Sequence, residues 1–322
     1  MSRYARQEIL PEVGAAGQSR LAAARILVVG AGGLAAPALP LLAGAGVGQI
    51  TIVDPDVVSL TNLHRQTLFS EQDVGLLKAE IACRRCQALN SEIAVLAVPE
   101  ALTPANAGAL VGAADLVLDC ADSYAASYIL SDSCLAAGKP LISASALGLS
   151  GYVGGFCGGA PSLRAVFPDA PESGASCATA GVLGPVVGML GAMQAQMALG
   201  LLIAPCGHSS PLGQVVNLDA MSLRTSIFRF DDAPEPELRF SFAARADLND
   251  GDTIVDLRGH QEAPEPIHPA ARRVAPQDIS RIAPRQGRLA LACATGLRAW
   301  RAAETLHPDW PGEIVLVAAS AS

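Results

Sequence analysis

The stretch Arg25-Ile26-Leu27-Val28-Val29-Gly30-Ala31-Gly32-Gly33-Leu34-Ala35 decides the fold. Its first five residues form a short apolar run, which is typical of a strand buried in a parallel sheet. The glycines predict a tight turn into a helix that ends near Ala45. Glycines let a phosphate approach the backbone, and the N–H groups at a helix N-terminus bind it. The turn therefore predicts a nucleotide site at Gly30, Gly32 and Gly33, and a tight turn without a ligand is the alternative.

Strands and helices alternate downstream of this turn. An amphipathic pattern predicts a helix over residues 78–89, and apolar runs predict strands over 49–53, 92–98, 116–119 and 140–144. This alternation predicts an α/β fold with a doubly wound, Rossmann-like sheet and right-handed crossovers.

A composition shift divides the chain. Residues 231–237 are rich in proline and acidic side chains, as is typical of a linker. After them the strand pattern returns over 253–257, 288–292 and 313–317, with a helix over 296–306. We therefore expect a large domain over residues 1–235, a linker over 236–250 and a small α/β domain over 251–322.

Composition excludes several classes of protein. The 322 residues include 22 basic and 30 acidic side chains, a formal charge of −8, and 51% of them are hydrophobic. These values exclude intrinsic disorder and argue against a nucleic-acid partner. The most apolar stretch, 181–204, contains Pro185 and two glutamines, which favours a buried helix over a membrane span. With no apolar leader and eight scattered cysteines, we expect a cytoplasmic protein with reduced thiols.

Polar residues after the second and fourth expected strands indicate which nucleotide is bound. Asp54 lies about 20 residues beyond the glycines, where a carboxylate grips ribose hydroxyls in NAD and ATP sites alike. Asn62, Arg65 and Lys78 follow, and such a cluster favours a triphosphate because cations neutralise a pyrophosphate leaving group. Asp122 follows the fourth strand and would hold Mg²⁺ with few protein ligands.

Lysine is scarce in this chain. Only Lys78 and Lys139 are lysines among the 22 basic residues. A lysine retained within a polar cluster favours a functional role for Lys78 over a solvated residue at a helix start.

Six segments occur in order within the first 230 residues: Arg3-Tyr4-x-Arg6-Gln7, Gly30-Ala31-Gly32-Gly33-Leu34, Val53-Asp54-x-Asp56-Val57-Val58, Asn62-Leu63-His64-Arg65-Gln66, Asp73-Val74-Gly75 and Lys78. This ordered set resembles the ThiF/MoeB/HesA family, the bacterial relatives of ubiquitin-activating enzymes. The set is far more specific than a glycine motif alone.

The resemblance implies a nucleotidyltransferase. Such an enzyme uses ATP and Mg²⁺ to adenylate the C-terminal Gly-Gly carboxylate of a ubiquitin-like sulfur carrier of the ThiS/MoaD type. A carboxylate is already a nucleophile, so the step needs positioning and charge neutralisation rather than a general base. The resemblance also implies a homodimer, in which Arg6 reaches into the partner's site, and a cysteine desulfurase as sulfur donor. The residues it assigns to ATP or Mg²⁺ are Asp54, Asn62, Arg65, Gln66, Lys78 and Asp122.

The sequence departs from the family pattern at a few places. Ala35 stands where many relatives have glycine, and Asp122-Ser123 stands where they have Asp-Asn. Relatives carry two Cys-x-x-Cys pairs that hold a structural zinc. Here Ser162 and Ala165 occupy the first place and 234–237 the second, so we expect no zinc.

Two cysteines are candidates for covalent chemistry. Cys177 lies in a segment that resembles the family's crossover, whose cysteine forms a covalent link in some members; an unreactive loop thiol is the equal alternative. Cys293-Ala294-Thr295-Gly296-Leu297-Arg298 follows an apolar run and opens a helix, so its N–H groups would stabilise a thiolate or persulfide.

The second of these segments resembles part of a rhodanese domain. Val255-Asp256-Leu257-Arg258 and Ile267-His268-Pro269-Ala270 precede it in the same order as the rhodanese motifs. The resemblance implies a rhodanese-like domain in which Cys293 accepts sulfur as a persulfide and passes it to the acyl-adenylate, giving a thiocarboxylate. Because the chain ends soon after the last expected strand, a truncated domain that keeps the fold without the activity is the alternative.

Two other functions remain as alternatives for the whole chain. One is an NAD-dependent Rossmann oxidoreductase, against which Asn62, Arg65 and Lys78 speak. The other is a non-catalytic binding scaffold with a degenerate C-terminal domain.

Overall fold

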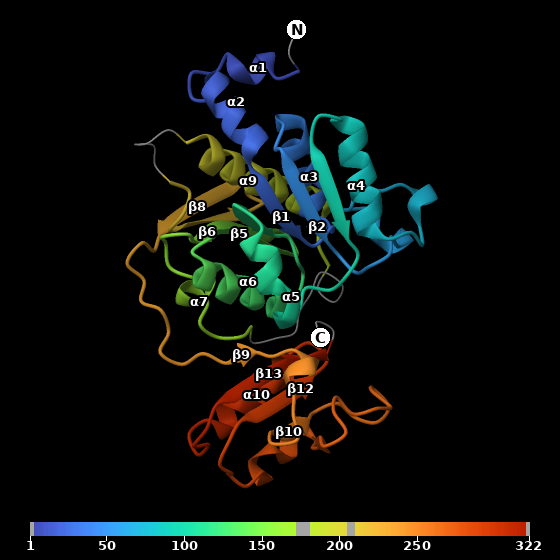
Figure 1. Ribbon diagram of the computed structural model, residues 1–322, viewed down its shortest axis with the longest axis vertical. Helices are drawn as coiled ribbons and strands as arrows, with labels where there is room; N and C mark the ends of the chain where they lie inside the picture. The colour runs from blue at the N-terminus through green and yellow to red at the C-terminus, as the bar shows by residue number, and fades with distance from the viewer. Residues whose placement is uncertain (1–2, 172–180, 205–209, 320–322) are drawn as a thin grey trace.

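Two sheets organise the chain in a computed structural model that describes residues 3–171, 181–204 and 210–319. The strand order is β3-β2-β1-β4-β5-β6-β7-β8 in the larger sheet and β11-β10-β12-β13-β9 in the smaller one. The larger sheet and its helices lie above the smaller sheet in Figure 1, and the chain passes from β8 down to β9. The protein is therefore a large α/β domain followed by a small C-terminal module.

The larger sheet is parallel on one side and antiparallel on the other. Strand β1 pairs with β2 and β4, and β3 and β5 extend this parallel part. From β5 onward the pairs β5–β6, β6–β7 and β7–β8 are antiparallel. The strands are β1 Arg25–Val29, β2 Gln49–Val53, β3 Ala94–Val98, β4 Leu116–Asp119, β5 Pro140–Leu147, β6 Ser150–Cys157, β7 Gln214–Asp219 and β8 Arg224–Arg229.

Both faces of the parallel part are covered by helices. Along β1, Ile26 and Val28 join one hydrophobic cluster, whereas Leu27 and Val29 join the other, as the alternation of a strand requires. This explains why the segment is continuously apolar. One face carries α2 Gly14–Ala23, α3 Ala35–Ala45, α4 Lys78–Leu89 and α9 Gly184–Ile203, and the other carries α5 Pro104–Gly112 and α6 Tyr124–Ala137.

Short elements complete the large domain and the connections. Two of them are four-residue α-helices and four are 3-10 helices. They are α1 Ala5–Glu8, α7 Leu163–Val166, η1 Leu60–Asn62, η2 Glu71–Asp73, η3 Arg245–Asp247 and η4 Pro276–Arg281.

Helix α9 is both long and apolar. By length and composition it is the one described helix that could cross a bilayer. It packs instead against α3, β5 and β6, and its Gln194 donates to the carbonyl oxygen of Asp119 at 2.8 Å. The helix therefore packs on the sheet of the large domain through one part of its surface, with Gln194 fully buried.

The C-terminal module is a five-stranded sheet in which every pair is parallel. Strand β9 lies within 236–250, the stretch expected to be a linker, and pairs with β13 at the sheet edge. The module thus draws on residues before 251. Its elements are β9 Ser241–Phe242, β10 Thr253–Asp256, β11 Arg272–Arg273, β12 Leu289–Cys293, α10 Leu297–Leu306 and β13 Ile314–Ala318.

A hydrophobic core runs through the contact between the domain and the module. At its centre the buried Arg164 pairs with Asp132 at 2.7 Å and donates to the carbonyl oxygen of Phe240. Its guanidinium carbon lies 4.4 Å from the centre of the Tyr128 ring and 5.5 Å from that of Trp300. This arginine joins α6, the residue before β9 and α10, so the two parts are packed together rather than merely tethered.

Candidate active site

The glycine-rich turn lies between β1 and α3, at the carboxyl end of the parallel strands. Gly30 has φ +91°, and a Cβ there would lie 2.5 Å from the carbonyl oxygen of Cys120, so only glycine fits. Gly32 and Gly33 lie beside the next candidates. A Cβ at Gly32 would lie 3.7 Å from Nε2 of Gln66, and one at Gly33 would lie 3.5 Å from Cγ of Arg65. The structure therefore brings the turn and the 62–66 segment together, as the sequence predicts.

Asp54 holds the turn from the end of β2. Its carboxylate accepts hydrogen bonds from the N–H of Ala31 at 2.6 Å and of Asp56 at 2.8 Å. Burial raises the pKa of Asp54, while these hydrogen bonds and the charge of Lys78 oppose that rise. The carboxylate thus fixes the backbone of the turn, and each oxygen keeps a further lone pair for a ligand hydroxyl.

Lys78 is an almost buried cation at the first residue of α4. Only 5% of it is exposed, and its Nζ lies 2.8 Å from Oδ2 of Asp56. The N-terminus of a helix disfavours a cation because the macrodipole is positive there. An adjacent anion offsets this cost, and Asp56 supplies one in the described structure.

Arg65 and Gln66 lie beside the turn. The guanidinium of Arg65 contacts Nε2 of His64 at 2.9 Å and the carbonyl oxygen of Thr61. The Oε1 atom of Gln66 is buried and has no hydrogen-bond partner among the described residues. Such an orphaned acceptor suits a ligand that donates a hydrogen bond. Asn62 ends η1, one turn before them.

Two aspartates mark the end of β4. Asp119 is fully buried and accepts hydrogen bonds from Oγ of Ser143 at 2.8 Å and from the N–H of Ala121. Burial raises the pKa of Asp119 to about 6, and the charge of Asp122 adds to the rise. Asp122 itself is exposed beyond the strand. The two neighbours therefore differ in role, because Asp119 supports the loop and Asp122 faces solvent.

Three candidates lie away from this cluster or cannot be placed. Arg6 is exposed on α1, at the end of the molecule opposite the C-terminal module in Figure 1. Cys177 falls outside the described residues. Cys293 lies in the C-terminal module, at the end of β12.

The Cys293 loop has the geometry of a site for a negatively charged sulfur. The N–H of Gly296 donates to Sγ of Cys293 at 3.1 Å. Glu262 raises the pKa of Arg298 most, and the sulfur of Cys293 raises it further. Asp256 pairs with Arg258 at 2.8 Å, which fixes the second arginine near the loop. In the sequence, Arg298 stands out only as the last residue of the Cys293–Arg298 motif. Its position at the start of α10 is the signal that points to a role beside the sulfur.

Other described thiols are poor nucleophiles because burial raises their pKa values. The pKa is raised to about 12 for Cys86 and Cys157, and it is also raised for Cys83, Cys120 and Cys134. This supports the interpretation that most of the cysteines are core residues.

The places of the family's zinc ligands hold a different contact. Glu235 accepts from the N–H of Ser162 at 2.7 Å and from its Oγ at 2.6 Å. Arg239 donates to Oε2 of Glu235 at 2.9 Å. This set lacks the thiolate and imidazole donors of a structural zinc site and does not fit one. In the described ranges, no group of three or more His, Cys, Asp or Glu residues could hold a metal. Absence of zinc stays a prediction, which elemental analysis of the purified protein checks.

We expect Glu235→Ala to lower the free energy of unfolding by about 1–3 kcal/mol, because the buried N–H of Ser162 loses its charged acceptor. Urea unfolding measures the change. The exposed Glu237 provides the matched control, since Glu237→Ala removes a carboxylate of the same linker. Equal stability of the two variants would show that the contact does not hold the linker.

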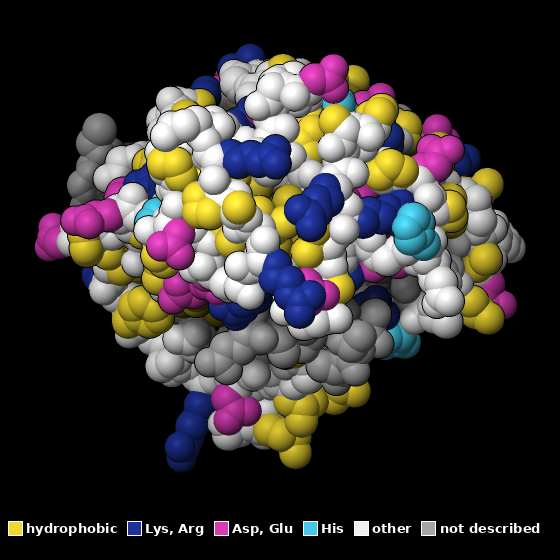
Figure 2. Space-filling model, turned by 90° about the horizontal axis from the view of Figure 1, so that it is seen from below, with side chains coloured by type: hydrophobic (Ala, Val, Ile, Leu, Met, Phe, Trp, Pro, Cys, Tyr) yellow, Lys and Arg dark blue, Asp and Glu magenta, His cyan; other side chains and the backbone are white. Residues whose placement is uncertain are grey.

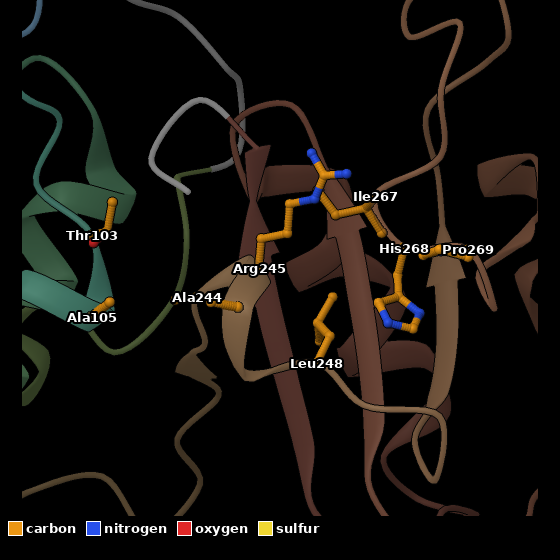
Figure 3. A pocket seen from close by; sticks show the side chains of 9 residues that line it. Thr103, Ala105, Ala244, Arg245, Leu248, Ile267, His268 and Pro269 are labelled. Atoms are coloured by element: carbon orange, nitrogen blue, oxygen red, sulfur yellow. The ribbon is translucent and has the colours of Figure 1, made fainter.

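A hollow of about 530 Å³ lies between the two parts, away from the glycine turn. Thr103 and Ala105 line it from the start of α5, and Arg245, Leu248 and His268 line it from the module (Figure 3). Figure 2 views the end of the molecule formed by the module, where basic side chains lie among neutral and hydrophobic ones. The hollow is therefore a feature of the contact rather than part of the nucleotide cluster.

A glycine turn at the carboxyl edge of a doubly wound sheet, with charged side chains gathered round it, defines a nucleotide-binding α/β protein. The sequence profile of the ThiF family matches residues 4–239. The chain belongs to the ThiF family.

Curated relatives match the large domain. The adenylyltransferase and sulfurtransferase MOCS3 of Bos taurus is 48% identical over 196 residues, which are 60% of this chain and 43% of the relative. The adenylyltransferase and sulfurtransferase uba4 of Aspergillus fumigatus (strain CBS 144.89) is 44% identical over 220 residues, which are 65% of this chain and 44% of the relative. The match thus spans less than half the length of these relatives.

Solved structures of E. coli MccB share the fold. MccB with MccA-N7isoASN has a TM-score of 0.64 at 23% identity and covers 74% of each chain. MccB with ATP has a TM-score of 0.63 at 23% identity and covers 73% of each chain. At this identity the likeness shows the fold alone.

Proposed function

We propose that this protein is an ATP-dependent adenylyltransferase for a ubiquitin-like sulfur carrier with a Gly-Gly C-terminus. The observation that best supports this is the almost buried Lys78, held at a helix N-terminus beside the glycine turn. A triphosphate supplies the anion that such a position favours. The relatives named above as adenylyltransferases and sulfurtransferases support the same reaction class.

The reaction needs little from the protein except position and charge. The carrier carboxylate attacks the α-phosphorus of ATP, the bond to the bridging oxygen breaks, and pyrophosphate leaves. Lys78 and Arg65 neutralise charge on the leaving group, and Asp54 and Gln66 orient the nucleoside or the phosphates. Asn62 adds a polar contact. Asp122 would hold Mg²⁺, which supplies further charge neutralisation at the phosphates.

The expected homodimer gives Arg6 its role. It lies exposed on α1, and we propose that it acts in the site of the partner subunit.

Sulfur transfer is proposed for the C-terminal module. A persulfide on Cys293 attacks the acyl carbon of the carrier adenylate, AMP leaves, and an acyl disulfide forms. A thiol must then cleave the S–S bond to release the thiocarboxylate, and Cys177 is our candidate. An external thiol reductant restores both cysteines. A cysteine desulfurase is the proposed sulfur donor, and the cytoplasm is the proposed compartment.

Exchange of radiolabelled pyrophosphate into ATP tests the first step. We expect exchange that depends on both Mg²⁺ and a carrier ending in Gly-Gly, because only a carrier carboxylate in the site completes the adenylate. A carrier that lacks its last glycine is the matched control and should support none. No exchange with any carrier, together with tight NAD binding, would favour a Rossmann oxidoreductase instead.

A further inference from the structure

The sulfur loop of the module faces the large domain. Cys293 ends the central strand β12 and is fully buried. Gly296, which donates to its sulfur, has φ +89° and begins α10. A Cβ at Gly296 would lie 2.8 Å from the Oη atom of Tyr124 and 2.8 Å from the ring of Phe242. Part of the wall around the loop thus comes from outside the C-terminal sheet.

Tyr124 belongs to the large domain. It is the first residue of α6 and follows Asp122 by two positions. Its ring packs at an angle on the rings of Phe242, with centroids 6.1 Å apart, and of Tyr128, with centroids 5.8 Å apart. These contacts hold the ring against the sulfur loop.

The hydroxyl of Tyr124 is buried and has no hydrogen-bond partner among the described residues. A buried hydroxyl without a partner is costly, and native proteins rarely keep one without a reason. By contrast, the Tyr128 hydroxyl, one turn further along α6, lies within hydrogen-bonding distance of the carbonyl oxygens of Phe167 and Asp169. The two tyrosines therefore differ in the partner available to their hydroxyls.

We propose that Tyr124 is a positioning residue of the sulfur site, whose hydroxyl donates a hydrogen bond to the sulfur carried by Cys293. The inference rests on the proposed sulfur transfer. A persulfide adds a sulfur atom about 2 Å beyond Sγ, and its terminal sulfur is an anion that accepts hydrogen bonds. The N–H of Gly296, the Arg298 guanidinium and the Tyr124 hydroxyl then surround it.

The sulfur site is thus shared between the two parts of the chain. Its backbone donor and its arginine come from the module, and its hydroxyl donor comes from the helix that begins beside Asp122.

Sulfur transfer from thiosulfate to cyanide by the full chain tests the role. The Cys293 thiolate takes the outer sulfur of thiosulfate and releases sulfite, and cyanide then takes that sulfur as thiocyanate. Tyr124→Phe keeps the ring and removes the hydroxyl, so we expect the rate to fall roughly tenfold, as for the loss of one hydrogen bond to a charged group. Tyr128→Phe removes a hydroxyl from the same helix, whose partners Phe167 and Asp169 lie in the large domain, and it should keep most of the rate.

A spectroscopic signal separates a hydrogen bond from packing. With 3-fluorotyrosine at position 124, the fluorine resonance should move when thiosulfate loads Cys293, and with the label at position 128 it should stay. Because 3-fluorotyrosine keeps the ring and the hydroxyl, the labelled protein still tests the hydrogen bond if the Tyr124→Phe variant does not fold.

The role of Tyr124 and the sulfur transfer on Cys293 are overturned by different results. Full activity of Tyr124→Phe, an equal loss in Tyr128→Phe, or a fluorine signal at 124 that ignores loading would overturn the role of Tyr124. Activity that survives Cys293→Ala would overturn the proposed sulfur transfer itself.

Discussion

Lys78→Met is expected to lower the rate of ATP–pyrophosphate exchange by about 10²–10³-fold, the loss typical of removing one group that stabilises developing charge. The physical reason is the position of the ammonium. It is almost buried and forms an ion pair with Asp56. The N–H of Asp56 donates to Asp54, the carboxylate that holds the glycine turn. Methionine preserves the length and the packing of the side chain but carries no charge.

The chain offers a matched control for this experiment. Lys139 is its only other lysine, and it lies between α6 and β5, at the far end of the parallel strands from the turn. Lys139→Met should therefore exchange pyrophosphate at the wild-type rate. An exchange rate for Lys78→Met within threefold of wild type would contradict the role of Lys78 in adenylation.

Cys293→Ala is expected to abolish formation of the carrier thiocarboxylate while adenylation continues. The Cys293 thiol is the group that carries the transferred sulfur in the proposed reaction, and alanine has no sulfur atom to replace it. Mass spectrometry of the carrier, after incubation with ATP and thiosulfate, should show the acyl-adenylate or its hydrolysis product instead of the thiocarboxylate.

Cys83→Ala controls for a general effect of removing a thiol. Cys83 lies on α4, where its Sγ donates to the carbonyl oxygen of Val95, and burial raises its pKa. This variant should form thiocarboxylate normally. Thiocarboxylate formed by Cys293→Ala at the wild-type rate would assign sulfur transfer to a different group.

Local patterns in the sequence predict the parallel half of the large sheet well. The apolar runs at β1, β2 and β4 begin and end where expected, because strands buried on both faces must be apolar throughout. The expected strand over 92–98 begins at Ala94, and the one over 140–144 continues to Leu147. The glycine turn and residues 65–66 come together because the carboxyl ends of parallel strands share an edge.

The antiparallel half was not predicted. Strand β8 is exposed along its whole length, so it lacks the continuous apolar pattern that marks the other strands. Strand β9 has two residues and sits in a stretch whose prolines and acids suggest a linker.

Contacts between distant segments also escaped sequence analysis. Ser162 and Glu235 are brought together by the fold, as are Tyr124 and Gly296. No local sequence pattern predicts either pair, because a single glutamate or a single tyrosine is not part of a repeating pattern of apolar and polar residues.

The short path between Asp122 and Tyr124 has a kinetic consequence. Two residues of chain span at most about 7 Å, so the nucleotide loop and the wall of the sulfur loop are neighbours at the start of α6. Under the proposed function, the activated carrier meets the persulfide at an effective concentration set by this geometry rather than by the bulk solution. Once the acyl-adenylate has formed, sulfur transfer then competes with its hydrolysis as a step within the assembled enzyme and needs no second encounter in solution.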